Sequence, residues 1–215
     1  MNRLKISILS LLMLLLFFMN SRGEDISASD IIKKVRKKID KVTLISAEFV
    51  QTFEWAIAGE SRENTGKIYI GRKDAFRIQT PEQVIISDGK TVWTIDNVNR
   101  QVIIDNLDNS EDALLPRQLF VRYEKDYRVS LAGIEKVQKH DCYHLILMPK
   151  NEDVYIQKLE VWINRKTWLT QKVSYLDAND NVTTYLIQNI QLLNQSQKDL
   201  FRYTEQPDFE VIDMR

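Results

Sequence analysis

The sequence predicts a mainly β chain with a few helices, an α+β protein built on about 11 antiparallel strands. Apolar and polar residues alternate from Leu44 onward, which is the period of a strand with one buried face. Short β-rich runs follow, and turn signals such as Ser87-Asp-Gly-Lys-Thr91 separate them. A twisted antiparallel sheet of that size must curl or split to bury one face. The period of apolar residues favours a curled sheet with amphipathic helices over its mouth. A two-sheet sandwich is the alternative that this period does not exclude.

Residues 1–23 have the pattern of a signal peptide. A basic start precedes an apolar run from Ile6 to Met19, and Ser21 and Gly23 are small residues at the positions that a signal peptidase requires. The run of about 14 residues is shorter than the ~20 that span a bilayer, and no cysteine follows it as a lipid-attachment site. We expect cleavage before Glu24 and a soluble, unanchored mature chain.

The remaining residues, 24–215, suffice for one domain with a full core or a sizeable cavity. The chain has 30 basic and 30 acidic residues, a balance that is untypical of nucleic-acid binding. Its single cysteine, Cys142, excludes an internal disulfide. Neither a phosphate-binding glycine loop nor a His-Glu-x-x-His or Gly-x-Ser-x-Gly element occurs. We therefore expect a monomer without a cofactor and without a catalytic residue.

The first expected element of the mature chain is an amphipathic helix, which Ser27 or Ser29 can cap. One face is apolar and the opposite face is basic. The apolar stripe comprises Ile31, Ile32, Val35, Ile39 and Val42, and the basic face comprises Lys33, Lys34, Arg36, Lys37, Lys38 and Lys41. The basic face is either simply solvated or a docking surface for anionic headgroups or a membrane partner.

A long strand begins at Leu44, and Gln51 interrupts its apolar side. That side carries Ile45, Ala47, Phe49, Phe53, Trp55 and Ile57. Further strands are expected near 65–71, 75–80, 83–88, 91–96, 101–105, 126–132, 134–139, 142–148, 154–163, 167–176 and 182–192. A helical segment starts near Asn109 and is kinked or divided at Pro116. The final segment, from Asp199 to Met214, contains one short apolar run.

His140, Cys142 and His144 form the one constellation that resembles a metal site. On a strand these side chains point to one side, spaced ~6–7 Å apart along the backbone. Two imidazoles and a thiolate are suitable ligands for zinc or copper. The alternative is a strand start at which Cys142 is a small buried hydrophobe. Because no fourth ligand is evident, we expect no metal.

The ordered motifs between residues 66 and 104 resemble the signature of the periplasmic outer-membrane lipoprotein carriers, the LolA family. They are Gly66-x-Ile-x-Ile, Arg72, Phe76, Pro81, Ser87-Asp-Gly-Lys-Thr-x-Trp93, Asp96 and Gln101-Val, with Phe49-x-Gln51 upstream. The resemblance implies an unclosed β-barrel with a helical lid over an apolar cavity, located in the periplasm of a Gram-negative bacterium. It implies acylated lipoproteins as cargo, an ATP-driven inner-membrane transporter as donor and an outer-membrane receptor lipoprotein as acceptor.

The resemblance also suggests which residues carry the function. The candidates for the acyl-chain cavity are Phe49, Phe53, Trp55, Ile78, Ile86 and Trp93, covered by Ile31, Val35, Leu114, Leu115 and Leu119. It implies that the guanidinium of Arg72 holds the lid shut through hydrogen bonds to helix carbonyls, the alternative being an ordinary surface arginine. Lys73 stands where the family usually has proline, so the sequence does not indicate whether this loop is as rigid as in the family. For Phe76 the resemblance implies contact with the release machinery, the alternative being a core aromatic.

Three other functions compete with lipoprotein carriage. A related carrier could move another lipid or lipid-linked molecule, and only its cargo would distinguish it. A secreted enzyme acting on lipid or glycan would need a catalytic carboxylate pair or a nucleophile in the cavity. A structural or sensory domain would bind acylated proteins without extracting them from a membrane.

Overall fold

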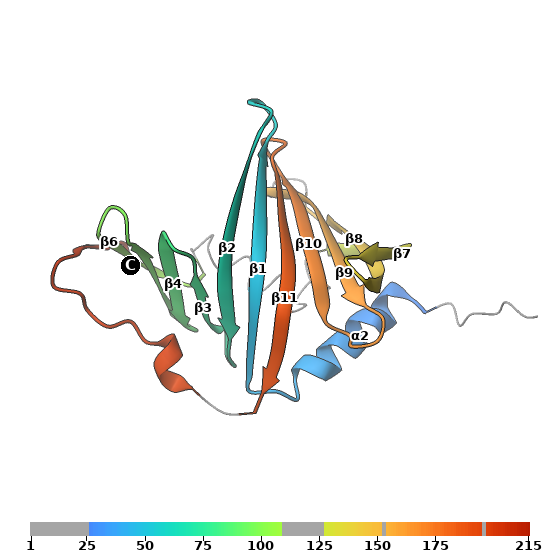
Figure 1. The fold of residues 1–215 in the computed structure, drawn as a ribbon, viewed down its shortest axis with the longest axis horizontal. Helices are drawn as coiled ribbons and strands as arrows, with labels where there is room; N and C mark the ends of the chain where they lie inside the picture. Colours follow the sequence, from blue (N-terminus) through green and yellow to red (C-terminus); the bar gives the residue numbers. More distant parts are fainter. Residues whose placement is uncertain (1–25, 109–126, 152–153, 195–196) are drawn as a thin grey trace, which may run out of the picture.

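The computed structural model describes residues 26–108, 127–151, 154–194 and 197–215. Twelve strands form one sheet in the order β12-β6-β5-β4-β3-β2-β1-β11-β10-β9-β8-β7 (Figure 1). Their bounds are β1 Leu44–Trp55, β2 Glu60–Ile70, β3 Ala75–Gln79, β4 Gln83–Asp88, β5 Thr91–Asp96, β6 Gln101–Asn106, β7 Tyr127–Val137, β8 His140–Pro149, β9 Ile156–Asn164, β10 Thr170–Asp177, β11 Val182–Leu193 and β12 Glu210–Asp213. No pairing joins β12 to β7 among the described strands, so the sheet is unclosed.

The predicted fold class, a mainly β chain with an unclosed and largely antiparallel sheet, is confirmed. Two meanders, β1–β6 and β7–β11, meet where β1 pairs with β11 along most of their length. Figure 1 shows these long strands in the middle of the sheet, with the shorter strands of each meander on either side. The pairing of β12 with β6 is the parallel exception.

The predicted N-terminal helix forms as α2 (Ala28–Ile39), but it ends at Ile39, so Lys41 and Val42 of the expected faces lie in the turn that follows. The hydroxyl oxygen of Ser27 accepts a hydrogen bond from the backbone N–H of Asp30 at 3.1 Å and caps the first turn. Ile31, Ile32 and Val35 are fully buried against the sheet, whereas the basic residues of the last turn suit the negative end of the helix dipole. No helix in the described part of the chain is long and apolar enough to cross a membrane.

The C-terminal segment packs on β4, β5 and β6, on the face of the sheet opposite to the one that contributes to the apolar cluster with α2. Its 3-10 helix η2 (Lys198–Phe201) brings the Phe201 ring against Gly71, where a Cβ would lie only 2.7 Å from the ring. Beyond η2, Tyr203 stacks on Trp93 with 6.0 Å between ring centroids. Tyr203 and Phe209 pack against a second apolar cluster of Val84, Ile86, Ile95 and Val102. The chain then ends as β12.

Three details differ from the sequence-based expectations. Strand β7 is one strand where two were expected, because a register shift between Leu131 and Gly133 lets the chain continue past the irregularity. Strand β2 begins at Glu60 instead of residue 65, and the short apolar run near the end forms β12. The expected signal peptide and the expected helical segment from Asn109, with Leu114, Leu115 and Leu119, lie outside the described residues.

Candidate functional site

The inner face of the sheet carries the main apolar cluster of the protein. Strands β1–β5 and β8–β11 contribute to it together with α2, and its members are buried. Ten partly buried apolar side chains pack against this cluster: Ile26, Ala28, Ile39, Ile70, Tyr127, Val129, Leu131, Trp168, Tyr175 and Ile190. Each of these ten side chains keeps part of its surface accessible at the border of the cluster.

Four of the predicted cavity residues belong to this inner cluster. Phe49 and Ile78 come from β1 and β3 of the sheet, and Ile31 and Val35 come from α2. Phe53 lies further along the same side of β1 and is half-buried. The structure therefore brings residues from the first strand, the third strand and the N-terminal helix to one apolar surface.

The strand register separates the candidates Ile86 and Trp93 from this inner cluster. Ile86 pairs with Arg77 and with Trp93, so these side chains point to the outer face, where both belong to the second cluster. Ile85, the neighbour of Ile86, occupies the inner face instead. Trp55 reaches the end of β1 and is 40% exposed, so it lies outside the inner cluster.

Polar atoms on the inner face are paired with one another. The amide of Gln51 donates a hydrogen bond of 3.0 Å to the Tyr185 hydroxyl oxygen, and the Tyr185 ring meets Phe49 edge to face at 5.8 Å. Burial raises the pKa of the nearby Tyr175 hydroxyl, which keeps it neutral. The surface thus remains suitable for an apolar ligand, because the polar groups named here need no partner from that ligand.

Arg72 lies at a pocket of about 320 Å³ at the start of β1. The pocket is lined by the end of α2 and the turn after it, the start of β1 and the connection between β2 and β3: Ile39, Asp40, Val42, Thr43, Leu44, Ile45, Ile70, Gly71, Arg72, Lys73, Asp74, Ala75 and Phe76. The Arg72 side chain is exposed, and no hydrogen bond or ion pair joins its guanidinium to another described residue. The last carbonyls of α2 are hydrogen-bond acceptors in the same neighbourhood. Phe76 is buried in the inner cluster, the environment of a core aromatic.

The loop that carries Arg72 has an unusual backbone. Lys73 and Asp74 both have positive φ, 57° and 61°, a region that side chains other than glycine rarely adopt. Proline, with φ fixed near −65°, would not fit at position 73 in this conformation. Gly89, from the Ser87–Thr91 turn, lies against the Lys73 carbonyl so closely that a Cβ would overlap it. The turn motif and the arginine loop therefore form one packed unit.

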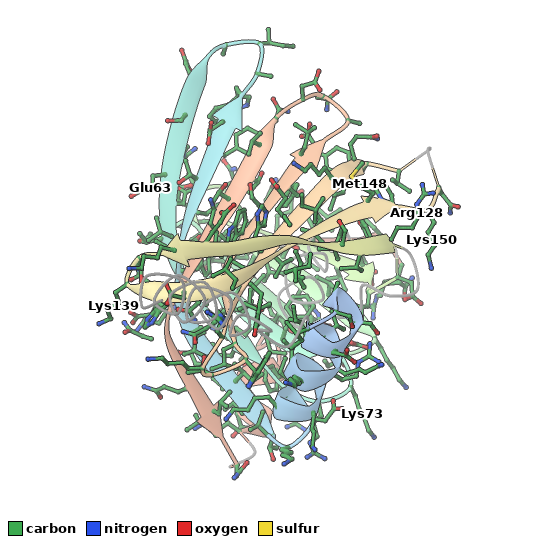
Figure 2. All side chains as sticks on the ribbon, turned by 90° about the vertical axis from the view of Figure 1, so that its right-hand side faces the viewer. Glu63, Lys73, Arg128, Lys139, Met148 and Lys150 are labelled. Carbon is green, nitrogen blue, oxygen red and sulfur yellow. The ribbon has the colours of Figure 1, made fainter. Side chains whose placement is uncertain are left out.

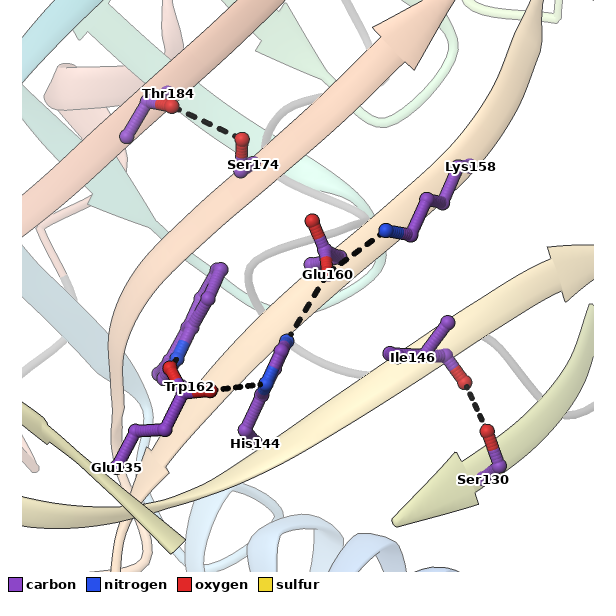
Figure 3. A network of polar contacts seen from close by, with 9 residues as sticks. All are labelled: Ser130, Glu135, His144, Ile146, Lys158, Glu160, Trp162, Ser174 and Thr184. Carbon is purple, nitrogen blue, oxygen red and sulfur yellow. Dashed lines mark hydrogen bonds and ion pairs between the residues drawn. The ribbon is translucent and has the colours of Figure 1, made fainter. Parts of the chain in front are cut away.

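His144 lies in a polar network on the outer face of β7–β10 (Figure 3). Its Nδ1 is 3.0 Å from Glu135 and its Nε2 is 3.2 Å from Glu160, while its ring stacks on Trp162 at 4.3 Å. A hydrogen bond from the Trp162 indole, with a smaller contribution from His144, holds the pKa of the Glu135 carboxyl below its usual range. Sequence patterns gave no signal for this network, because its members come from three different strands.

This network also bears on whether His144 and Cys142 could serve as metal ligands. Both ring nitrogens of His144 face carboxylates, and burial raises the pKa of the Cys142 thiol to about 11. A thiol that stays protonated is a poor metal ligand. The described residues contain no cluster of three or more side chains suited to a metal ion.

Comparison with known proteins agrees with the fold and the motifs. The family model "Outer membrane lipoprotein carrier protein LolA" matches residues 40–204. An outer-membrane lipoprotein carrier protein of Haemophilus ducreyi is 27% identical over 187 residues, 86% of this chain and 85% of the relative. One of Glaesserella parasuis is 26% identical over 221 residues, 100% of this chain and 98% of the relative.

A solved structure supports the fold independently of close sequence similarity. An uncharacterized conserved protein from Thermus thermophilus superposes with a TM-score of 0.59 at 15% identity, covering 86% of this chain and 98% of that one. The sequence family is one of carriers and not of enzymes. Because its model matches well over half of the chain, the protein belongs to the LolA family of outer membrane lipoprotein carrier proteins.

Proposed function

We propose that this protein is a soluble periplasmic carrier for lipoproteins on their way to the outer membrane. It binds the acyl chains of lipoproteins released from the inner membrane and delivers them to a receptor lipoprotein of the outer membrane. The observation that carries the proposal is the inner apolar face, on which the sheet and α2 gather one continuous cluster with accessible aromatic and aliphatic side chains around it.

The energetics of acyl chains explain why such a surface is needed. Each methylene exposed to water costs ~0.8 kcal/mol, so three chains of about fifteen carbons represent some 30 kcal/mol or more of gross cost. A carrier must therefore offer a surface nearly as apolar as the bilayer. Because the bilayer solvates the chains equally well, loading requires work from outside. An ATP-driven inner-membrane transporter is the donor that supplies it in this proposal.

Arg72 is the residue that we assign to closing the site. An empty apolar surface invites aggregation, so a cover that opens only for cargo is an advantage. The exposed Arg72 guanidinium has five donors and lies at the pocket where α2 ends. Hydrogen bonds from it to helix carbonyls would each contribute ~1 kcal/mol net, enough to bias the cover toward closure and weak enough to release it.

The proposal is tested with the mature chain, residues 24–215, and spheroplasts that carry the cognate transporter. After incubation, the soluble fraction is examined by mass spectrometry for acylated lipoproteins bound to the protein. One-to-one soluble complexes are the expected result. If the protein instead emerges with a different lipid, it is a carrier of another cargo, and if it extracts nothing, the carrier proposal is wrong.

A further inference from the structure

The hairpin formed by β1 and β2 ends in an exposed apolar tip. Figures 1 and 2 show this hairpin projecting beyond the neighbouring strands. The sequence at its end is Trp55-Ala-Ile-Ala-Gly59, without a charge. Ile57 is 97% exposed, more than any other large hydrophobic side chain in the described residues, and Trp55 is 40% exposed. Such a tip is unfavourable in water unless it contacts something apolar.

The tip is a fixed structure and not a loose loop. The N–H of Gly59 donates to the carbonyl of Trp55 at 2.9 Å, and the positive φ of Gly59, 65°, closes the turn. The N–H of Ala56 donates to the side-chain oxygen of Asn181 at 3.2 Å. The rings of Phe53 and Trp55 meet at 4.4 Å. Binding through this tip would therefore cost little conformational entropy.

Asn181 is itself held in place by a buried carboxylate. Asp177, which is almost fully buried, accepts hydrogen bonds from the backbone N–H and the side-chain amide of Asn181 at 3.0 and 3.1 Å. It also accepts from the Tyr155 hydroxyl at 2.9 Å. The β10–β11 turn is thus a rigid support for the tip of the neighbouring hairpin.

We propose that residues Trp55–Ala58 insert into the interfacial region of a lipid bilayer and dock the protein there transiently. Tryptophan favours the boundary between headgroups and acyl chains, and Ile57 adds an aliphatic side chain that can enter the hydrocarbon edge. The tip is narrow and convex, with charged residues on both sides. A stable protein interface needs about 800 Å² from each partner, which four residues on a projecting turn do not provide.

The charges around the tip indicate which lipids it contacts. Glu54 and Glu60 flank the apolar residues, and Glu63 follows on β2. The one nearby arginine, Arg62, is paired with Glu82 at 2.7 Å. An acidic collar is repelled by anionic headgroups, so the surface fits zwitterionic lipid. The flanking carboxylates also limit how deeply the tip can enter the bilayer. Only about one or two residues of each strand can insert, at ~3.3 Å per residue.

The proposed contact lies at the far end of the molecule from the Arg72 loop. Figure 2 shows Lys73 of that loop at the opposite end from the β1–β2 tip. The pocket beside Arg72 is therefore not covered when the tip meets a bilayer. Docking and cargo binding are separate properties, and each can fail without the other.

The experiment measures flotation of the mature chain with phosphatidylcholine–phosphatidylethanolamine vesicles. Partition of the Trp55→Ser/Ile57→Ser variant is expected to fall about tenfold or more, since both side chains lose their transfer into the interface. Val98→Ser is the matched control, because Val98 is 70% exposed in the β5–β6 turn, and it should float like the wild type. Exchanging part of the phosphatidylcholine for phosphatidylglycerol should weaken flotation.

A second measurement tests whether the Trp55 indole reaches the acyl chains of the bilayer. Phosphatidylcholine with brominated acyl chains should quench part of the tryptophan fluorescence of the wild type, and Trp55→Phe should lose that quenching while still floating. The inference is overturned if the wild type does not float, or if the double variant floats as well as Val98→Ser. Extraction of lipoproteins from spheroplasts by the double variant should be unchanged, which separates this result from a failure of the carrier proposal.

Discussion

The ring of Phe49 lies over Gly66 on the neighbouring strand. The two residues are cross-strand partners, and a Cβ at position 66 would lie 2.5 Å from the Phe49 Cζ atom and 2.7 Å from the Gln79 carbonyl oxygen. Two motifs that are far apart in the sequence, Phe49-x-Gln51 and Gly66-x-Ile, are therefore two halves of one contact. The glycine is present because the aromatic ring occupies the space of its side chain.

Gly66→Ala should destabilise the protein by about 1–3 kcal/mol, because the added methyl overlaps both the ring and the backbone of β3. Urea unfolding of the two proteins measures the difference. Phe49→Leu in the Gly66→Ala background should recover part of the loss, since the smaller side chain removes the ring overlap but not the backbone one. Equal stability of Gly66→Ala and the wild type would show that this contact is not close-packed.

Gly89→Ala should destabilise the protein more than Gly59→Ala. Both glycines have positive φ, so both substitutions carry the strain of about 1 kcal/mol of a left-handed alanine. At Gly89 the new methyl also overlaps the Lys73 carbonyl, whereas at Gly59 it meets open space. The same unfolding transitions, measured for both variants, give the comparison. A larger loss at Gly59 would contradict the packing of the turn against the arginine loop.

Arg72→Leu should leave the unfolding transition unchanged but alter the exchange of cargo. The side chain is exposed, so the fold does not depend on it, whereas losing one or two latch hydrogen bonds should shift the balance of loaded and empty protein by about fivefold or more. The readout is the loaded fraction after incubation with spheroplasts and the fraction passed to the receptor. Arg128→Leu, at an exposed arginine of β7, is the control. If uptake and delivery match this control, Arg72 has no part in the mechanism.

Asp177→Asn should remove a pH-dependent part of the stability. Burial acts to raise the pKa of this carboxyl, but hydrogen bonds from Asn181, Asn179 and Tyr155 outweigh it and hold the pKa below its usual range. Since the folded pKa is the lower one, the contribution is complete above the unfolded value of about 3.9 and disappears as the pH falls through the folded pKa.

The variant should therefore be about 1–2 kcal/mol less stable near neutral pH and approach the wild type in strong acid. Urea unfolding across this pH range measures the difference. Asp180→Asn, at an exposed position of the same turn, should follow the wild type throughout. A constant gap between Asp177→Asn and the wild type would show that the carboxylate does not titrate as described.

Local signals predicted the local features of the fold. The spacing of Ile31, Ile32 and Val35 predicted the helix, and the Ser87–Thr91 turn predicted the β4–β5 hairpin. The sequence left the helix cap open between Ser27 and Ser29, and the structure has Ser27 there. Each depends on residues that are close in sequence, where backbone preference and side-chain period decide the outcome. The pairing of β1 with β11 depends on strands that are far apart in the sequence, and no local pattern specifies it.

The face occupied by Ile86 and Trp93 could not be predicted for a similar reason. Val84, Ile85 and Ile86 are all buried, so the alternation that distinguishes the two faces is absent. The outer face is buried because Tyr203 and Phe209 return to cover it from the end of the chain. The packing of Gly89 against Lys73 could not be predicted from the sequence either, since the turn motif predicts a hairpin but not what the hairpin contacts.

The measurement that tests the central claim most directly is photo-cross-linking of bound cargo. A benzophenone amino acid is placed at Phe53, half-buried on the inner face of β1, and in a second variant at Trp93, partly buried on the outer face. Both positions are aromatic, so the probe is a comparable change in each. After loading from spheroplasts, irradiation should link the acyl chains of a lipoprotein to position 53 and not to position 93. Equal linkage at both positions, or linkage at position 93 alone, would contradict the assignment of the inner face as the carrier surface.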